Sequence, residues 1–520
     1  MGDQARPFKK SNMNTTQTEA LLAAYQHFFP AGVIGSYIKG ELQAGTGADI
    51  ALINPATGDL FVTYKDASTE IAAQACEAAL AGQKTWAAFS HAERGRLMQE
   101  AGRVLRTNIE QIAQLESISA GKPIRDCRGE ALRVAEMFEY YGGWTDKLYG
   151  NVIPVPSGHL NYTRREPMGV VLQITPWNAP LFTCGWQIAP AICMGNAVLL
   201  KPSELTPLSS LVVAKLIEQA GIPKGVVNIL VGYGHTIGQA ALGHPAVKKV
   251  VFVGSPATGR KIAAAAATRG IPCVLELGGK SANIVFEDAD LDRACIGAQS
   301  AIFGSAGQSC VAGSRLLVQR SIYDRFVKMV AEGASKIRLG DPSSPETEIG
   351  PIQNATQFKH VNSMIARGLQ EGAQIVGDTQ VAANQKNGFF VRPTVLRNVT
   401  NAMDVARTEI FGPVVVAIAF DTEEDAVNIA NDSDFGLAGA VWTKDTGRGF
   451  RVASQVKAGT FWINMYKVIN VASPFGGYDA SGYGRSSGVD ALVEYTQVKS
   501  VWVETAANPA QPFGYAPTNA

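Results

Sequence analysis

Gly169-Val170-Val171-Leu172-Gln173-Ile174 opens the stretch of sequence that determines the fold. Further short runs rich in Val, Ile and Leu follow it, at residues 197–201, 226–231, 250–253 and 273–277. Segments with helical periodicity separate these runs, at residues 181–194, 208–220, 236–242 and 256–268. Apolar strands that alternate with helices are typical of a parallel sheet covered on both faces. The stretch therefore predicts a doubly wound α/β domain that binds a dinucleotide at the carboxyl ends of its strands.

The sequence on either side predicts additional structure. Before this stretch, helical periodicity dominates residues 69–88, 91–117 and 125–149. After it, a second α/β pattern runs from 289 to about 471, with strands expected at 315–319, 414–419, 438–442 and 460–463 and helices at 322–337 and 354–372. Residues 151–165 and 496–503 alternate polar and apolar side chains, as strands that leave the body of a domain do. A chain of 520 residues exceeds the size of one hydrophobic core, so two or three domains are expected.

The composition excludes several classes of protein. With 46% apolar residues, 18% charged residues and a net charge of +1, the chain resembles a globular enzyme and has no global field that would recruit nucleic acid or an anionic membrane. Its seven cysteines contain no CxxC pair, and its six histidines contain no HExxH motif. We therefore expect no metal site and no disulfide framework, but reduced thiols in the cytoplasm.

Residues 168–200 carry no formal charge and are long enough to suggest a membrane helix. Pro176, Pro180 and Pro190 interrupt this segment, so a strand, a loop and a buried helix are the better interpretation. Residues 1–19 are polar and lack the apolar core of a signal peptide. We therefore expect no association with a membrane.

Cys310 differs from the other cysteines in its surroundings. It lies in Gly307-Gln308-Ser309-Cys310-Val311-Ala312-Gly313, a loop of small residues, whereas the other six lie in helical or strand-like runs. Upstream, Glu276 lies in Leu275-Glu276-Leu277-Gly278-Gly279-Lys280. A thiol can trap a carbonyl carbon, and a carboxylate can then activate water against the resulting thioester. The pair is therefore a candidate for covalent oxidation of an aldehyde.

With these motifs the sequence resembles the aldehyde dehydrogenase superfamily. The resemblance runs from about Pro55 to Val503 and includes Pro176-Trp177-Asn178, Lys201-Pro202-Ser203-Glu204, Glu409-Ile410-Phe411-Gly412-Pro413 and Pro474-Phe475-Gly476-Gly477. It implies that Cys310 is the nucleophile and that Asn178, with the backbone N–H of Cys310, stabilises the oxyanion. It also implies that Glu276 is the base for hydrolysis, which members that acylate coenzyme A lack. The alternatives are a turn role for Asn178 and a buried ion pair between Glu276 and Lys280.

The resemblance also implies a site for NAD. The turn Gly254-Ser255-Pro256-Ala257-Thr258-Gly259 opens a helix and would hold the pyrophosphate, although alone it could be an ordinary turn. Lys201 and Glu204 would contact the adenosine ribose, unless they form a solvated loop; a carboxylate there would repel a 2′-phosphate and favour NAD over NADP. The complete set of expected cofactor residues is Ile174, Thr175, Pro176, Trp177, Lys201, Ser203, Glu204, Gly234, Gly254, Ser255, Leu277, Glu409 and Phe411.

The remaining family positions would line a substrate funnel. They are Ala179, Phe182, Trp186, Val311, Ile469 and Phe475. Ala179 stands where many relatives carry an aromatic residue, so the funnel is expected to be roomy, mainly apolar and suited to aromatic or medium-chain aldehydes. Lys467 could meet a distal carboxylate, although a solvated loop lysine is the preferred interpretation. Asp479 stands where relatives often carry Lys, and nothing in the sequence explains this change.

These interpretations together predict the domain organisation. An NAD-binding domain would comprise residues 20–150 and 169–275, and a catalytic domain residues 276–480. Residues 151–168 and 490–505 would form a small β arm that pairs subunits into a homodimer or homotetramer, and residues 1–19 and 506–520 would be extensions. Two other functions remain open: a binding or structural protein that keeps the fold without activity, and a thiol esterase that uses Cys310 without a cofactor.

Overall fold

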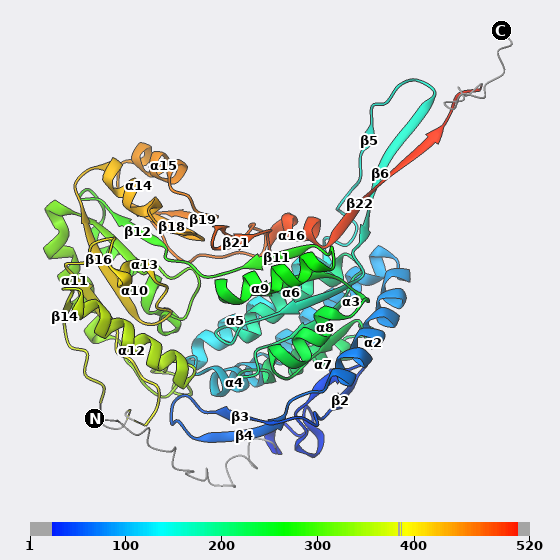
Figure 1. Cartoon of the computed structure of the whole chain (residues 1–520), viewed down its shortest axis with the longest axis horizontal. Coiled ribbons are helices and arrows are strands. Elements are labelled where there is room, and N and C mark those ends of the chain that lie inside the picture. Colours follow the sequence, from blue (N-terminus) through cyan, green and yellow to red (C-terminus); the bar gives the residue numbers. More distant parts are fainter. Residues whose placement is uncertain (1–22, 383–384, 386, 508–520) are drawn as a thin grey trace.

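The protein has two sheet-based bodies and a narrow projecting arm (Figure 1). The computed structural model describes residues 23–382, 385 and 387–507. The expected extension at residues 1–19 lies outside the described residues. Of the expected extension at 506–520, residues 508–520 also lie outside them. Among the described residues no helix is long and apolar enough to cross a membrane.

The first body contains the predicted doubly wound sheet. Its five central strands are all parallel: β7 (Val170–Ile174), β8 (Ala197–Lys201), β9 (Val227–Ile229), β10 (Val247–Val253) and β11 (Cys273–Glu276). They lie side by side in the order β9-β8-β7-β10-β11, so the direction of winding reverses between β7 and β10. In such sheets ligands bind at the carboxyl ends of the strands where the winding reverses. The predicted α/β class is therefore confirmed.

Helices cover both faces of this sheet, as expected from its uninterrupted apolar strands (Figure 1). They are α2 (Thr69–Ala88), α3 (His91–Thr107), α4 (Ile109–Ala120), α5 (Ile124–Gly142), α6 (Pro180–Cys193), α7 (Leu208–Gln219), α8 (Gln239–Gly243) and α9 (Pro256–Thr268). The single helix predicted at 91–117 is two helices, because Asn108 leaves the helical conformation and its side chain donates to the Val104 carbonyl. The uncharged segment 168–200 forms β7, a loop, α6 and β8.

Short antiparallel strands that the sequence did not predict precede these helices. They are β1 (Ser36–Ile38), β2 (Glu41–Gln43), β3 (Asp49–Ile53) and β4 (Leu60–Lys65). β1 and β2 extend the edge of the first sheet beyond β9, and β3 pairs with β4 as a separate hairpin.

The second body contains a seven-stranded sheet in the order β14-β15-β16-β13-β12-β18-β19. Its strands are β12 (Ala282–Val285), β13 (Arg315–Gln319), β14 (Gln374–Val376), β15 (Thr394–Arg397), β16 (Val414–Phe420), β18 (Ala438–Trp442) and β19 (Thr460–Ile463), and β14 is the antiparallel member. The main helices are α10 (Leu291–Phe303), α11 (Tyr323–Lys336), α12 (Ala355–Gln370), α14 (Glu423–Asn431) and α15 (Thr446–Gln455). The sequence predicted β13, β16, β18 and β19 but missed the short strands β12, β14 and β15.

The arm joins segments from distant parts of the chain. It consists of β5 (Val152–Ile153), β6 (His159–Pro167) and β22 (Thr496–Glu504), and it projects away from both bodies (Figure 1). Before β22, α16 (Gly488–Glu494) and Tyr495 pack on the first body, where the Tyr495 hydroxyl donates to Gln187 Oε1 at 2.8 Å. The short strand β21 (Gly482–Tyr483) likewise returns to pair with β11. The first sheet is therefore completed by residues from the end of the chain.

Candidate active site

A cavity of about 930 Å³ lies where the two bodies meet. The first body contributes the carboxyl ends of β7, β10 and β11 and one face of α5, and the second contributes loops around residues 304–311, 409–411 and 466–469. The predicted site residues that line it are Pro176, Trp177, Asn178, Ala179, Phe182, Trp186, Gly254, Ser255, Glu276, Leu277, Cys310, Val311, Glu409, Phe411, Ile469 and Phe475. The cavity therefore brings together the three expected catalytic side chains, most of the expected nicotinamide-side residues and the whole expected funnel.

Cys310 lies in the loop that joins α10 to β13. A 3₁₀ turn, Gly304–Gly307, begins this loop, and both Ser305 and Ala306 adopt positive φ. The thiol is partly buried, and burial raises its pKa to about 12, with a further rise from Glu276 and Glu409. Lys467 and the Val311 amide lower this pKa. The thiol is therefore protonated at neutral pH unless a neighbouring group accepts its proton.

Glu276 is the last residue of β11 and lies beside Val253 in the parallel register. Only 5% of its surface is exposed, and its Oε1 atom has no hydrogen-bond partner among the described residues. Burial raises its pKa to about 7, against smaller lowering effects of Ser486 and Arg485. A carboxylate with this pKa can exchange a proton near neutrality, as a general base requires. The alternative ion pair with Lys280 is not formed, because the charges near Lys280 are Arg315 and Glu409.

Asn178 follows β7 and lines the cavity. Its Nδ2 donates to the backbone carbonyl of Gln308 at 2.9 Å, two residues before Cys310. An amide nitrogen carries two hydrogens, so one contact leaves a second donor. This bond also links the first body to the thiol loop.

Two glycines in the segment after Glu276 permit the close approach of the second body. A Cβ atom at Gly278 would lie 2.1 Å from Glu409 Oε2, and one at Gly279 would lie 2.6 Å from the Cys310 carbonyl oxygen. The Gly279 amide donates to Glu409 Oε1 at 3.0 Å. Burial raises the pKa of Glu409 to about 7, and this amide and Lys280 oppose the rise. Side chains at either glycine would separate Glu276 from the thiol loop.

The expected nucleotide residues gather at the reversal point of the first sheet. Ser255 caps α9 by accepting from the Thr258 amide, and α9 points its N-terminus to this edge. Thr175 has a buried hydroxyl without a hydrogen-bond partner among the described residues. On the second body, Phe411 has positive φ and packs edge-on against Trp177, with ring centroids 5.4 Å apart.

Six of the expected cofactor residues lie outside the cavity lining, at and after the ends of β7, β8 and β9. They are Ile174, Thr175, Lys201, Ser203, Glu204 and Gly234. Lys201 ends β8 beside Ile174 and pairs with Glu204 at 3.2 Å. Only 3% of Lys201 is exposed, and burial lowers its pKa while Glu204 raises it. The alternative of a solvated loop is therefore wrong for Lys201.

Aromatic rings form the apolar side of the cavity. Phe182 packs on Trp186 at 4.9 Å between centroids, and Trp186 meets Phe475 edge-on at 5.8 Å. Both Phe182 and Trp186 belong to α6, which begins directly after Ala179. The small side chain of Ala179 leaves the space beside these rings open.

The opposite side of the cavity is charged, which the sequence did not reveal. Lys122, Arg125, Asp126, Glu130 and Arg133 line it from α5 and the turn before it. Asp126, Glu130 and Arg133 lie four and three residues apart, which places them on one face of α5, and this periodicity could have identified the face.

Lys467 also lines the cavity, so its interpretation as a solvated loop lysine is wrong. It adopts positive φ, which turns its side chain inward, and its Nζ donates to the Gly304 carbonyl at 3.3 Å. Burial lowers its pKa to about 8. Asp479, in contrast, lies outside the cavity lining and pairs with Phe435 through β20 (Tyr478–Asp479) and β17 (Phe435–Gly436).

The described residues contain no group of His, Cys, Asp and Glu arranged to hold a metal ion. All seven cysteines are free, and the six other than Cys310 lie in helices or strands.

The sequence matches the model of the Aldehyde dehydrogenase family over residues 42–501. It is 42% identical over 484 residues to the betaine aldehyde dehydrogenase of Mesorhizobium japonicum, which covers 92% of this chain and 98% of that one. Retinal dehydrogenase 2 of Homo sapiens is 42% identical over 474 residues, covering 90% and 91%. The structure resembles betaine aldehyde dehydrogenase from Staphylococcus aureus, solved in complex with NAD+, with a TM-score of 0.91, 35% identity and coverage of 96% and 99%. The matched range includes both bodies and the cavity.

Proposed function

The chain belongs to the aldehyde dehydrogenase family, and from this premise we propose that it oxidises an aldehyde with NAD through a thioester on Cys310, which Glu276 helps to hydrolyse. The observation that carries the proposal is the meeting of Cys310, Glu276 and Asn178 in one cavity at the reversal point of a dinucleotide-type sheet. The thiol and the carboxylate come from different bodies, so only the assembled fold brings them together.

Each residue has a defined part in the proposed reaction. The Cys310 thiol gives its proton to solvent water, and the sulfur then attacks the aldehyde carbon and forms a thiohemiacetal. The free N–H of Asn178 and the Cys310 amide stabilise the oxyanion that develops on the former carbonyl oxygen. Loss of hydride leaves a thioester, and Glu276 then removes a proton from water as it attacks. The acid product departs, and Cys310 regains its proton.

The residues at the reversal point fit NAD. Ser255 lies at the N-terminus of α9, where backbone amides favour a pyrophosphate, and the partnerless Thr175 hydroxyl lies at the adjoining end of β7. When bound, NAD+ would accept the hydride. Glu204 would accept hydrogen bonds from the adenosine ribose and disfavour a 2′-phosphate. Glu409 and Phe411 would contact the nicotinamide ribose from the second body.

The substrate funnel and the arm complete the proposal. Phe182, Trp186 and Phe475 support an aromatic or medium-chain aldehyde, because flat apolar groups pack well between such rings. The arm exposes apolar side chains, with Val498 57% and Trp502 58% exposed, and we expect another copy of this chain to cover them in a homodimer or homotetramer. The free thiols support a reducing, cytoplasmic environment.

The deciding experiment measures NADH by absorbance while the purified protein is supplied with NAD and with aliphatic, aromatic and carboxylate-bearing aldehydes. One NADH should form for each carboxylic acid produced. An inactive binding protein would produce neither, and a thiol esterase would cleave activated esters without NADH from any aldehyde.

A further inference from the structure

The charged side of the cavity is largely neutralised by internal ion pairs. Buried Lys122 forms ion pairs with Glu116, at 3.7 Å, and with Glu130. Arg125 pairs with Asp126 at 3.3 Å. Each cation of these pairs has a carboxylate partner, and Lys122 has two, so neither cation lacks a partner that a bound ligand would have to supply.

Lys467 and Arg133 are the remaining cations of the cavity lining. Among the described residues neither forms an ion pair with a carboxylate, and the Lys467 ammonium has one hydrogen-bond acceptor, the Gly304 carbonyl. An ammonium group can donate three hydrogen bonds, so donors remain for a ligand. Burial lowers the pKa of Lys467 to about 8 and Lys122 adds to this effect, whereas Cys310, Asp126 and Glu130 oppose it, so the protonated form is favoured at pH 7. Arg133 is exposed on the same face of α5.

The backbone that carries Lys467 is firmly anchored. Tyr466 donates through its hydroxyl to the Val311 carbonyl at 3.1 Å, next to the nucleophile loop. Asn464, at positive φ, exchanges two hydrogen bonds with the backbone of Thr443. The backbone that carries the Lys467 side chain is therefore fixed both to the thiol loop and to the second sheet.

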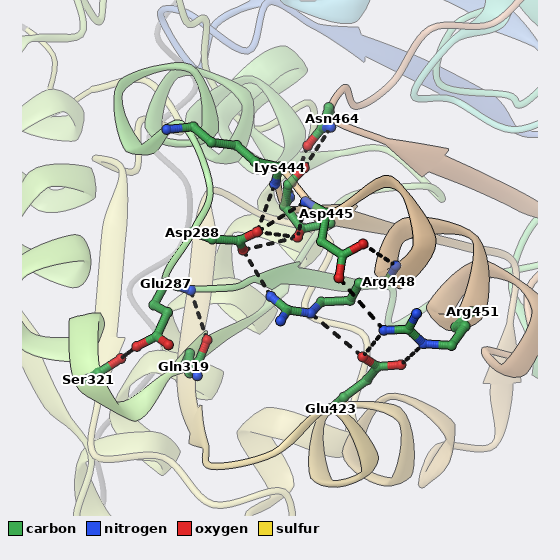
Figure 2. A network of polar contacts seen from close by, with 11 residues as sticks. Glu287, Asp288, Gln319, Ser321, Glu423, Lys444, Asp445, Arg448, Arg451 and Asn464 are labelled. Carbon is green, nitrogen blue, oxygen red and sulfur yellow. Dashed lines mark hydrogen bonds and ion pairs between the residues drawn. The ribbon is translucent and has the colours of Figure 1, made fainter.

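A polar network extends this anchor into the second body, and Figure 2 shows it from Asn464 to Arg451. Asp288 accepts from the Thr443 hydroxyl and from Arg448 Nη1 at 3.0 Å. Arg448 and Arg451 both pair with Glu423, at 3.6 and 2.9 Å. Fixed groups lose less entropy on binding than mobile ones, so a lysine on this support is suited to recognise one ligand group.

We propose that Lys467, assisted by Arg133 nearer the solvent, selects aldehydes that carry a carboxylate at the end remote from the carbonyl. This inference rests on the proposed function, because it concerns the substrate of the same site. The aldehyde carbon would lie at Cys310 and the apolar body of the substrate against Phe182 and Trp186. The carboxylate would supply the missing partner for the cations, as charge-assisted hydrogen bonds favour.

The test compares two aldehydes of matched shape, 4-formylbenzoate and 4-methylbenzaldehyde, by NADH formation in the wild type and in Lys467→Met, Lys467→Arg and Lys444→Met. Wild type should prefer 4-formylbenzoate at least about tenfold in kcat/KM. Lys467→Met should lower the ratio of kcat/KM for 4-formylbenzoate over that for the neutral aldehyde by about 10- to 100-fold, mainly through the KM for 4-formylbenzoate, in addition to any loss that both aldehydes share because a charge beside the thiol is removed. Lys467→Arg should retain the preference.

Lys444→Met is the matched control, because it removes one positive charge from the same body but lies outside the cavity lining. This variant should leave kcat/KM unchanged for both aldehydes. Equal losses for both aldehydes in Lys467→Met would assign Lys467 to the thiol loop and overturn the inference. A wild type that prefers the neutral aldehyde would also overturn it while leaving the proposed function intact. Absence of NADH with every aldehyde would instead refute the proposed function.

Discussion

The two walls of the cavity are constructed differently. The wall from the first body contains the ends of β7, β10 and β11, whose relative positions follow from the hydrogen-bonded register of a parallel sheet, together with side chains of α5 and α6. The wall from the second body is formed mostly by loops, with a few residues from α10 and α12, and Ser305, Phe411 and Lys467 in these loops all adopt positive φ. Such backbone is unfavourable for residues other than glycine and persists only where surrounding contacts impose it.

The difference separates two tasks. The strand ends provide a regular edge at which a common cofactor can bind, and they also hold Glu276. The loops carry the thiol and Lys467, which would contact the substrate together with Phe182 and Trp186 of α6. A change in the loops should therefore alter chemistry or substrate choice, whereas a change at the strand ends should alter cofactor use or the hydrolytic step.

The largest effect should follow removal of the thiol from the loop wall. Cys310→Ala should lower NADH formation by more than about 10³-fold, because no covalent intermediate can form. NAD binding, measured by calorimetry, should persist because the strand-end wall is unchanged. Cys295→Ala is the control, because Cys295 is buried in α10 and lies outside the cavity lining. This variant should remain active. Loss of NAD binding in Cys310→Ala would show that the two walls are not independent.

A smaller but distinctive effect should follow at the strand ends. Glu276→Gln should slow steady-state turnover by about 10²- to 10⁴-fold, the usual contribution of a general base. Rapid mixing should still give a burst of NADH, because hydride leaves before the base acts. Disappearance of the burst would assign Glu276 to activation of the thiol instead. Glu287→Gln, an exposed acid of the second body, should behave as wild type.

The pH dependence gives the same prediction a second measurement. Burial raises the pKa of Glu276 to about 7, so its carboxylate form is lost as the pH falls through 7. The kcat of the wild type should therefore rise between about pH 6 and 8, where hydrolysis limits turnover. The residual turnover of Glu276→Gln should lack this rise.

The smallest effect should concern cofactor choice. Glu204→Ser should reduce the ratio of kcat/KM for NAD over NADP at least about tenfold, or about 1.4 kcal/mol. The substitution removes a charge that repels the 2′-phosphate and frees Lys201 from its 3.2 Å ion pair. Glu77→Ser, at an exposed position of α2, should leave the ratio unchanged. An unaltered ratio in Glu204→Ser would mean that this carboxylate does not meet the ribose.

The contrast between the walls also explains what could be predicted from sequence. Strands β7, β8 and β10 have local signals, namely apolar residues between helices, and their parallel order follows general rules. The inward position of Lys467 depends on positive φ and on the Gly304 carbonyl, which is distant in sequence. The strands β12, β14 and β15 are three or four residues long and carry a weak signal. The strands β9 and β19 are equally short, but β9 lies in the longer apolar run 226–231, and β19 contains only β-branched and aromatic residues. Family motifs predict the catalytic residues, whereas the helical spacing of Asp126, Glu130 and Arg133 indicates a charged face of α5 but does not place this face at the cavity.

The pairing of β21 with β11 has a consequence for how the protein is made. Translation delivers β11 early, but its neighbour β21 leaves the ribosome only after the entire second body. Until then the edge of β11, which carries Glu276, has exposed backbone groups that can pair with another nascent chain. The sheet of the first body can therefore start to form before the second body is synthesised, but it is complete only after β21 is synthesised. A chain released before β21 would keep an unpaired edge strand that can pair with other chains.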